Sequence, residues 1–336
     1  MKTTTFCVLF LLLPTVCWAD SSIGVGFSRV TIDDPMGGNM VVSIWYPSDQ
    51  KNEVVELGPF EFPGTRNASL AHGQFGLVVL SHGTRGSDLG HRDIAIVLAK
   101  SGYVVAAPRH PRDNYQNYSG SGKRIVWEGR PRQVTAVIDF FVGDESWSKS
   151  IDEQKIGIFG FSIGGYTALA TLGAKPSLSH VIEHCALHEN DDPFCDYDGS
   201  IDTNEYTDLP INLRDSRICT AVVADPVAVP FPDSAIESMP PISILFYRPE
   251  KENVLSAKYH VGRVVDILRN LPDFPNPALK LVKGAHHYSF ISPFPESIAA
   301  RYPEIASDSE EFDRTEFHVS FGQEIIEFFR KEFSGC

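Results

Sequence analysis

From residue 75 to the C-terminus, short and mostly apolar runs alternate with segments whose apolar positions recur at helical spacing. The runs lie at 77–80, 103–107, 155–159, 220–224, 242–246 and 279–282. Their nearly continuous apolar character is typical of strands that are covered on both faces. The helical segments lie at about 89–100, 134–142, 166–170 and 312–333. Repeated units of this kind predict an α/β fold with a mainly parallel central sheet and helices on both faces.

The first quarter of the chain has a different pattern. Residues 23–47 predict opening β-structure, in which a strand at 41–46 ends because Pro47 cannot continue it. Residues 48–74 are polar and rich in glycine, proline and asparagine, which indicates a long surface connection.

A second polar stretch, residues 110–129, indicates a loop before the helix at 134–142.

The N-terminus has the pattern of a secretory signal peptide. Lys2 supplies a positive charge, residues 6–16 are largely apolar, and Ala19 suits the position before a cleavage site. We therefore expect residues 1–19 to be removed and the mature chain to begin at Asp20. The apolar stretch is shorter than the ~20 residues of a spanning helix. The sequence predicts a secreted or periplasmic protein with no stable membrane anchor.

Composition narrows the choice further. The chain has 336 residues, 43% of them hydrophobic, and a formal net charge of −14. It can bury one large core, and we expect a single domain over residues 20–336. The negative charge disfavours nucleic acid or an anionic membrane surface as a partner.

Four cysteines remain after the predicted cleavage: Cys185, Cys195, Cys219 and Cys336. An even number in an exported protein predicts disulfide bonds. Cys185 and Cys195 are close enough in sequence to close a local loop, and the other two could then pair. Three connectivities are possible, however, and the sequence does not choose among them.

The strongest motif is Gly160-Phe161-Ser162-Ile163-Gly164-Gly165, which stands between the strand at 155–159 and the helical segment at 166–170. A G-x-S-x-G sequence between a strand and a helix predicts a sharp turn that lifts the serine hydroxyl above the sheet. Glycines on both sides are required because such a turn leaves little room. Ser162 is therefore the candidate nucleophile.

A serine nucleophile needs a base and a group that orients the base. In the chain order Ser, acid, His, the base must come late, and the pair His286-His287 follows the last predicted strand directly. We prefer His287 over His286. For the acid, Asp225 ends the strand at 220–224, whereas Glu250 follows the next strand within a charged run that reads as solvated surface. We prefer Asp225 and keep Glu250 as the alternative.

Negative charge on a reacting carbonyl oxygen requires two backbone N–H donors. One is expected from Ile163, directly after the nucleophile, at the first turn of a helix. The other is expected from the loop after the strand at 77–80, at Thr84. His82 on the same loop is expected to be structural.

These motifs together resemble a family. The chain is similar to secreted serine hydrolases related to platelet-activating-factor acetylhydrolase, whose bacterial members are often labelled dienelactone-hydrolase-like. The resemblance covers residues from about 24 to the C-terminus except 176–217. It implies the α/β-hydrolase fold, Ser162, Asp225 and His287 as the triad, Thr84 and Ile163 as the oxyanion donors, and no cofactor. It rests on Trp45-Tyr46-Pro47, Val79-Leu80-Ser81-His82-Gly83, Gly102–Pro108, Arg130-Pro131, the 160–165 motif and Gly284-Ala285-His286-His287.

Residues 176–217 form an insertion that departs from this resemblance. Between Glu183 and Asp208 there are nine acidic residues and no lysine or arginine, so the segment repels itself unless it is solvated or neutralised. Its place after the elbow helix suits a cap over the pocket. Asp196-x-Asp198-Gly199 partly imitates a calcium loop, but Phe194 stands at the first ligand position. We favour a solvated loop and expect no metal.

The sequence therefore predicts an exported serine esterase or lipase that acts on a small-molecule or lipid ester through an acyl-enzyme. An acetylhydrolase-type phospholipase and a polyester-degrading enzyme both fall within this class. True dienelactone hydrolases use a cysteine nucleophile, so Ser162 argues against that activity. A non-catalytic binding module and a peptidase remain as alternatives of other classes.

Overall fold

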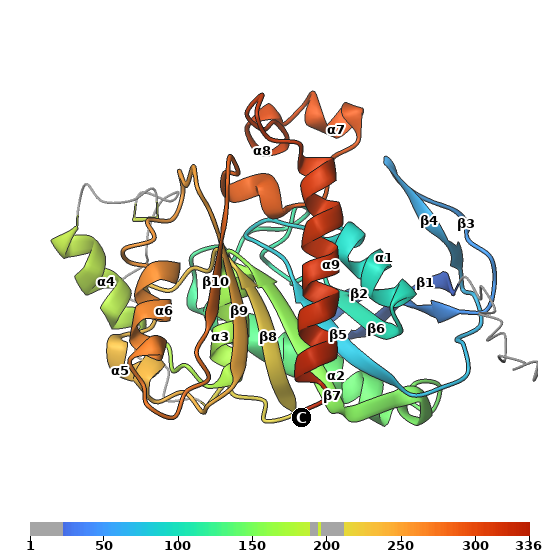
Figure 1. Cartoon of the computed structure of the whole chain (residues 1–336), viewed down its shortest axis with the longest axis horizontal. Helices are drawn as coiled ribbons and strands as arrows, with labels where there is room; N and C mark the ends of the chain where they lie inside the picture. The colour runs from blue at the N-terminus through green and yellow to red at the C-terminus, as the bar shows by residue number, and fades with distance from the viewer. Residues whose placement is uncertain (1–22, 189–193, 196–211) are drawn as a thin grey trace, which may run out of the picture.

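The structure is a computed structural model that describes residues 23–188, 194–195 and 212–336 (Figure 1). In these residues ten strands form one sheet in the order β10-β9-β8-β7-β5-β6-β2-β1-β4-β3. Every pairing from β6 through β5, β7, β8 and β9 to β10 is parallel. The strands are β1 (Gly24–Asp33), β2 (Asn39–Ser48), β3 (Glu53–Leu57), β4 (Phe60–Arg66), β5 (Phe75–Ser81), β6 (Tyr103–Pro108), β7 (Ile151–Phe161), β8 (Ile218–Ala224), β9 (Ser243–Pro249) and β10 (Ala278–Val282).

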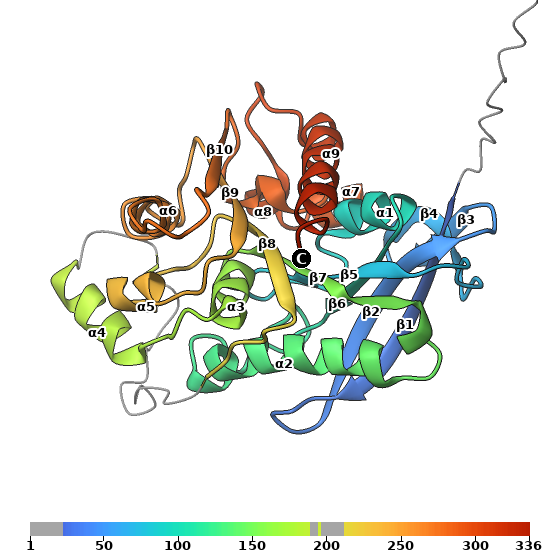
Figure 2. The ribbon, with the colours of Figure 1, turned by 60° about the horizontal axis from the view of Figure 1, so that its bottom comes forward.

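Helices cover both faces of the sheet (Figure 2). One face carries α1 (Arg92–Lys100) and α9 (Arg314–Glu332), and the other carries α2 (Arg124–Gly143), α3 (Ile163–Leu172) and α6 (Val261–Arg269). The remaining helical segments are η1 (Ser148–Ser150), α4 (Leu178–Leu187), α5 (Asp233–Glu237), η2 (His287–Phe290), α7 (Glu296–Ala299) and α8 (Pro303–Ala306). The predicted mainly parallel sheet with helices on both faces is confirmed.

The core lies in two layers because successive strand residues point to opposite faces. In β5, Leu77 and Val79 join the cluster beneath α2 and α3, whereas Val78 and Leu80 join the cluster beneath α1 and α9. All four side chains are buried. This two-sided burial explains why the strand reads as an unbroken apolar run rather than as an alternating one.

The prediction of a surface connection over residues 48–74 was wrong. β3 and β4 form an antiparallel hairpin within it, with Val55 opposite Phe62. Both side chains are buried while Val54 and Glu61 are exposed, so the segment has the alternation of a half-buried strand. Phe62 packs edge-on against Phe27 of β1, with ring centroids 5.2 Å apart. Burial against a strand far away in the sequence therefore makes this segment a hairpin, although its local composition is polar.

The predicted loop over residues 110–129 was also too long, because α2 begins at Arg124. This helix contains Pro131, which has no N–H to donate to the carbonyl of residue 127 four positions earlier. The hydroxyl of Tyr166, in α3, donates to the Trp127 carbonyl oxygen at 2.9 Å and replaces the missing bond. A partner from another helix therefore makes an interior proline tolerable, and no local pattern reveals that.

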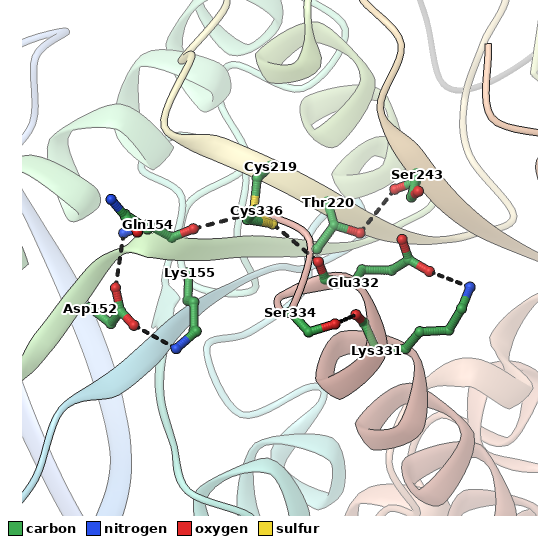
Figure 3. Close-up of a disulfide and its surroundings, with 10 residues drawn as sticks. All are labelled: Asp152, Gln154, Lys155, Cys219, Thr220, Ser243, Lys331, Glu332, Ser334 and Cys336. Carbon is green, nitrogen blue, oxygen red and sulfur yellow. Dashed lines mark hydrogen bonds and ion pairs between the residues drawn. A yellow bond between two sulfur atoms is a disulfide. The ribbon is translucent and has the colours of Figure 1, made fainter.

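Two disulfide bonds join Cys185 to Cys195 and Cys219 to Cys336, one of the three pairings that the sequence allowed. Figure 3 shows the second bond, which ties the end of the chain after α9 to β8. Cys219 is near the beginning of β8, six positions before Asp225, and a strand rises about 3.3 Å per residue. The bond is therefore about 20 Å from the end of β8 where Asp225 stands.

The predicted signal peptide lies outside the described residues, as do residues 189–193 and 196–211 of the insertion, which include its Asp196-x-Asp198-Gly199 motif. Among the helices of the described part, none combines the length and the apolar character that crossing a membrane requires.

We predict that replacing both Cys219 and Cys336 with serine lowers the free energy of unfolding by about 3–5 kcal/mol, because the bond closes a loop of 117 residues. Urea unfolding of oxidised protein with and without the two substitutions measures this loss. The matched control replaces Cys185 and Cys195, whose loop is only 10 residues long, and should cost about 2–3 kcal/mol. An equal or larger loss in the control would contradict the prediction.

Candidate active site

Ser162 occupies a strained turn between β7 and α3. Its backbone has φ 56° and ψ −120°, a conformation that residues with a Cβ rarely adopt. The turn is held by the end of the neighbouring strand, since the Ser162 N–H donates to the Ala224 carbonyl at 3.0 Å. The Ser162 carbonyl in turn accepts from the N–H of Val227 at 3.0 Å. The strained residue is thus fixed by the same segment that carries Asp225.

Two glycines of the motif are required by close backbone contact. A Cβ at Gly164 would lie 1.9 Å from the carbonyl oxygen of Ser81, at the end of β5. A Cβ at Gly160 would lie 2.1 Å from the carbonyl oxygen of Gly164. Because α3 begins in direct contact with β5 and β7, any larger residue would push the helix away and change the turn at Ser162.

The three side chains that the sequence singled out form one hydrogen-bonded chain. The Ser162 hydroxyl lies 3.1 Å from Nε2 of His287, and Nδ1 of His287 lies 2.6 Å from Oδ2 of Asp225. An imidazole with its proton on Nδ1 donates to the carboxylate and accepts from the hydroxyl. Ser162 is 8% exposed, His287 2% and Asp225 0%, so the bonds are largely shielded from water. This arrangement can remove the hydroxyl proton as the oxygen attacks a carbon.

The two alternatives from the sequence lie elsewhere. Nε2 of His286 lies 2.7 Å from the carbonyl oxygen of Ser307 and 3.1 Å from Asp308, and its Nδ1 accepts from the N–H of Tyr288. Glu250 is exposed, and its carboxylate accepts from the backbone N–H of Gly284 at 2.9 Å. His286 therefore caps η2, and Glu250 braces the turn before it.

Sequence reasoning missed Glu252. It lies in the charged run after β9 that the sequence predicts to be solvated surface, yet its side chain is only 14% exposed. Its Oε1 lies 3.6 Å from Nδ1 of His287 and accepts the backbone N–H groups of Val254 and Leu255. The available signal was its place beyond the end of the strand next to β8, just before the apolar pair Val254-Leu255.

The loop after β5 passes directly beside Ser162. A Cβ at Gly83 would lie 3.5 Å from the Ser162 Cβ. The buried guanidinium of Arg130 holds this loop by donating to the carbonyls of His82 and Gly83 at 2.7 and 3.2 Å. In addition, the N–H of Arg85 donates to Asp113 at 3.1 Å. Thr84 therefore stands between two anchored residues.

The predicted oxyanion donors have no acceptor in the part of the chain that the structure describes. Within the described residues, neither the N–H of Thr84 nor that of Ile163 has a hydrogen-bond acceptor. Ile163 is the first residue of α3, where N–H groups have no partner inside the helix. The two donors are thus available to a ligand, while their roles stay predictions.

Both ring nitrogens of His82 bond to backbone groups, as expected of a structural residue. Its Nδ1 lies 2.7 Å from the Gly83 carbonyl, and its Nε2 accepts the N–H of His110 at 3.2 Å. Burial and the neighbouring charge of Arg130 hold the pKa of His82 well below its ordinary value. The imidazole therefore stays neutral and serves as an acceptor.

The charges around His287 shift its titration. Burial lowers the pKa of His287, but the hydrogen bonds and charges of Asp225 and Glu252 outweigh burial and raise the pKa to about 9. Burial raises the pKa of Asp225 well above its ordinary value; His287 opposes this rise and Glu252 adds to it. The proton on this cluster is therefore bound more tightly in the folded protein than in the unfolded chain.

Among the described residues, Asp225, Glu252 and His287 also form a group that could hold a metal ion, since one ligand atom from each lies within 4.8 Å of the others. A metal on Nδ1 would replace the proton that bridges to Asp225. The 2.6 Å separation between Nδ1 and Oδ2 fits a charge-assisted hydrogen bond. The geometry thus favours a proton over a metal between these groups.

We predict a pH-dependent contribution of His287 to stability. A folded-state pKa of about 9 against an unfolded value of 6.5 stabilises the protein fully below pH 6.5, and this stabilisation is lost as the pH rises through 9. Relative to His287→Gln, the free energy of unfolding should fall by about 2–3 kcal/mol between pH 7 and pH 10. Urea unfolding of both proteins across this range measures it. A difference that stays constant or grows with pH would contradict the raised pKa.

Comparisons with known proteins give structural matches alone. No protein-family model matches the chain, and no curated protein matches it. The ferulic acid esterase from Streptomyces cinnamoneus is 16% identical with a TM-score of 0.61, and the match covers 94% of this chain and 92% of that one. The esterase Pf2001 from Pyrococcus furiosus is 13% identical with a TM-score of 0.50, over 91% and 93% of the two chains. These likenesses and the parallel sheet show the α/β-hydrolase fold.

Proposed function

We propose that this chain is an exported serine hydrolase that cleaves carboxylic esters through an acyl-enzyme. Ser162 is the nucleophile, His287 the general base and Asp225 the acid that orients it. The observation that carries the proposal is the hydrogen-bond chain from the Ser162 hydroxyl through His287 to Asp225, set on a strained turn at the carboxyl ends of the strands. Ligands in sheets of this type bind at that edge.

The reaction follows from the positions of the donors and acceptors. As Ser162 Oγ attacks the ester carbonyl, its proton passes to Nε2 of His287 and the imidazolium is held by Asp225. The proton then goes to the departing alcohol, which leaves an ester on Ser162. Water then attacks the carbonyl of this ester and gives its proton to His287. The proton passes on to Ser162 Oγ as the acyl–serine bond breaks, and the carboxylic acid leaves. The N–H groups of Thr84 and Ile163 are proposed to stabilise the negative oxygen of each tetrahedral intermediate.

The proposed substrate class is a small-molecule or lipid ester. The two solved structures compared above are named esterases, and both match this chain along nearly its whole length. The resemblance to acetylhydrolase-type enzymes supports a lipid ester within that class. Two disulfide bonds among the described residues support export to an oxidising compartment.

We expect Ser162→Ala to lower kcat on p-nitrophenyl esters by about 10⁴–10⁶, because the covalent route is lost and the oxyanion donors alone leave modest catalysis. An organophosphonate probe should label the wild type and not this variant. The matched control is Ser320→Ala, at an exposed position of α9, which should keep both activity and labelling.

The same assay separates the alternatives. Esters of graded acyl length, a short-chain phospholipid, a polyester film and a peptide anilide are tested side by side on the wild type. Cleavage of the anilide alone would identify a peptidase instead. Probe labelling that survives Ser162→Ala would overturn the assignment of the nucleophile, and a wild type that neither turns over nor labels would indicate a binding module.

A further inference from the structure

Two carboxylates, not one, face the Nδ1 side of His287. Oδ2 of Asp225 lies 2.6 Å from Nδ1, and Oε1 of Glu252 lies 3.6 Å from the same nitrogen. They come from neighbouring parallel strands: Asp225 directly follows β8, and Glu252 comes three residues after the end of β9. Ala224 and Tyr247 are paired across these strands. The sheet therefore brings two acids to one imidazole.

Glu252 is held in this position by backbone hydrogen bonds. Its Oε1 accepts the N–H of Val254 at 2.5 Å and that of Leu255 at 2.6 Å. The residues before it are bonded to the segment that leads to His287, since the N–H of Lys251 donates to the Ala285 carbonyl at 2.8 Å. The N–H of Glu250 likewise donates to the Val282 carbonyl at 3.0 Å. The short distance to Nδ1 is therefore set by rigid backbone rather than by one free rotamer.

The other two carboxylate oxygens are buried without compensation. Oδ1 of Asp225 and Oε2 of Glu252 have no hydrogen-bond partner among the described residues. Unpaired buried acceptors of this kind are costly and call for an explanation. Two ionised carboxylates this close repel each other, whereas a proton retained on one of them relieves the repulsion. Burial and Glu252 both raise the pKa of Asp225, and His287 opposes them.

Two aromatic rings also pack against the His287 imidazole. The ring of Phe161 lies 4.9 Å from that of His287, and Tyr288 packs edge-on at 5.2 Å between ring centroids. Burial and the charges of Glu252 and Glu304 raise the pKa of Tyr288, so the phenol stays neutral. The hydrogen bonds and charges of Asp225 and Glu252 are the largest contributions that raise the pKa of His287. In this shielded site, a charge 3.6 Å away acts strongly on the imidazole.

We propose that Glu252 is a second positioning residue for His287, acting with Asp225 to stabilise the imidazolium that forms when Nε2 takes the Ser162 proton. The proposal rests on the proposed serine hydrolase function. Glu252 does not contact Ser162 or the substrate and acts only through Nδ1. It keeps the proton on Nδ1, and thereby Nε2 free to accept, when Asp225 is neutral or replaced. It also shifts the rising limb of kcat/KM against pH, where His287 loses its proton, toward higher pH.

The first test is Glu252→Gln. The amide oxygen of glutamine can still accept the N–H groups of Val254 and Leu255, so the substitution removes the charge and spares the local structure. We expect the rising limb of kcat/KM against pH to move at least one unit toward acid, with KM within twofold of the wild type. The rate of organophosphonate labelling should shift in the same way. Glu250→Gln, which can keep its bond to Gly284, is the matched control and should leave both profiles unchanged.

The second test measures the coupling of the two acids. With Glu252 present, Asp225→Asn should lower kcat by only about 10–10², because the Glu252 carboxylate, 3.6 Å from Nδ1, still stabilises a proton there by its charge. The variant with both Asp225→Asn and Glu252→Gln should fall by about 10³–10⁴, the loss expected when a triad acid is neutralised without a substitute. A full 10³–10⁴ loss in Asp225→Asn, with none added by Glu252→Gln, would overturn the proposal. So would an unshifted pH profile in Glu252→Gln.

Two measurements on the wild type keep the proposal testable if a variant fails to fold. NMR titration of the His287 ring should give a midpoint above pH 8, and a lower midpoint would contradict a second acid at Nδ1. Activity should survive a chelator. Loss of activity on chelation with recovery on adding Zn²⁺ would mean that the three groups hold a metal, and would overturn the proposal.

Failure of this inference is distinct from failure of the proposed function. If the wild type hydrolyses esters and is labelled at Ser162 but Glu252→Gln behaves as the wild type, the second acid alone is wrong. If the wild type is neither active nor labelled, the hydrolase function is wrong, and the NMR midpoint of His287 still decides whether Glu252 acts on its imidazole.

Discussion

The close approach of α3 to the end of β5 is the constraint on which the site depends. Gly164 leaves no room for a Cβ because the Ser81 carbonyl lies where that atom would be. The helix can therefore begin immediately after Ser162, and the turn becomes sharp enough to lift the hydroxyl above the end of the sheet. The same turn is bonded to Ala224 and Val227 on either side of Asp225. Ser162 and Asp225 are thus placed by one set of backbone contacts, and the His287 ring lies within hydrogen-bond distance of both.

A buried polar network supports the second wall of the site. Arg130 is 1% exposed, pairs with Asp113 at 2.9 Å and donates to the carbonyls of His82 and Gly83. A buried ion pair of this kind contributes little net stability, but losing one partner is costly because the other charge remains unpaired. The ion pair instead fixes a position: Arg130 holds the loop that contains Thr84 through its backbone carbonyls.

The candidate site and the Cys219–Cys336 disulfide lie at opposite ends of the sheet. The carboxyl ends of β5, β7 and β8, with the loop after β10, gather the polar groups of the site, including the strained backbones of Ser162 and Asp225. Near the other end of β8, the bond between Cys219 and Cys336 holds the C-terminus after α9. A buried apolar cluster on each face of the sheet surrounds the strands that hold the strained backbone at one end.

The sequence by itself determined the parallel sheet, the elbow at Ser162 and the strand ends from which Asp225 and His287 extend. These are local properties, since burial on two faces and a tight turn are visible in apolar runs and in glycine spacing. Only the tertiary structure showed that His287 and Asp225, rather than His286 and Glu250, share a hydrogen-bonded chain with Ser162, and which of three disulfide pairings forms. It also buried Glu252 within a charged run and made a hairpin of residues 53–66. Each of these depends on the distance between segments far apart in the chain, which the order of the strands and the bonds between their loops establish and no local pattern contains.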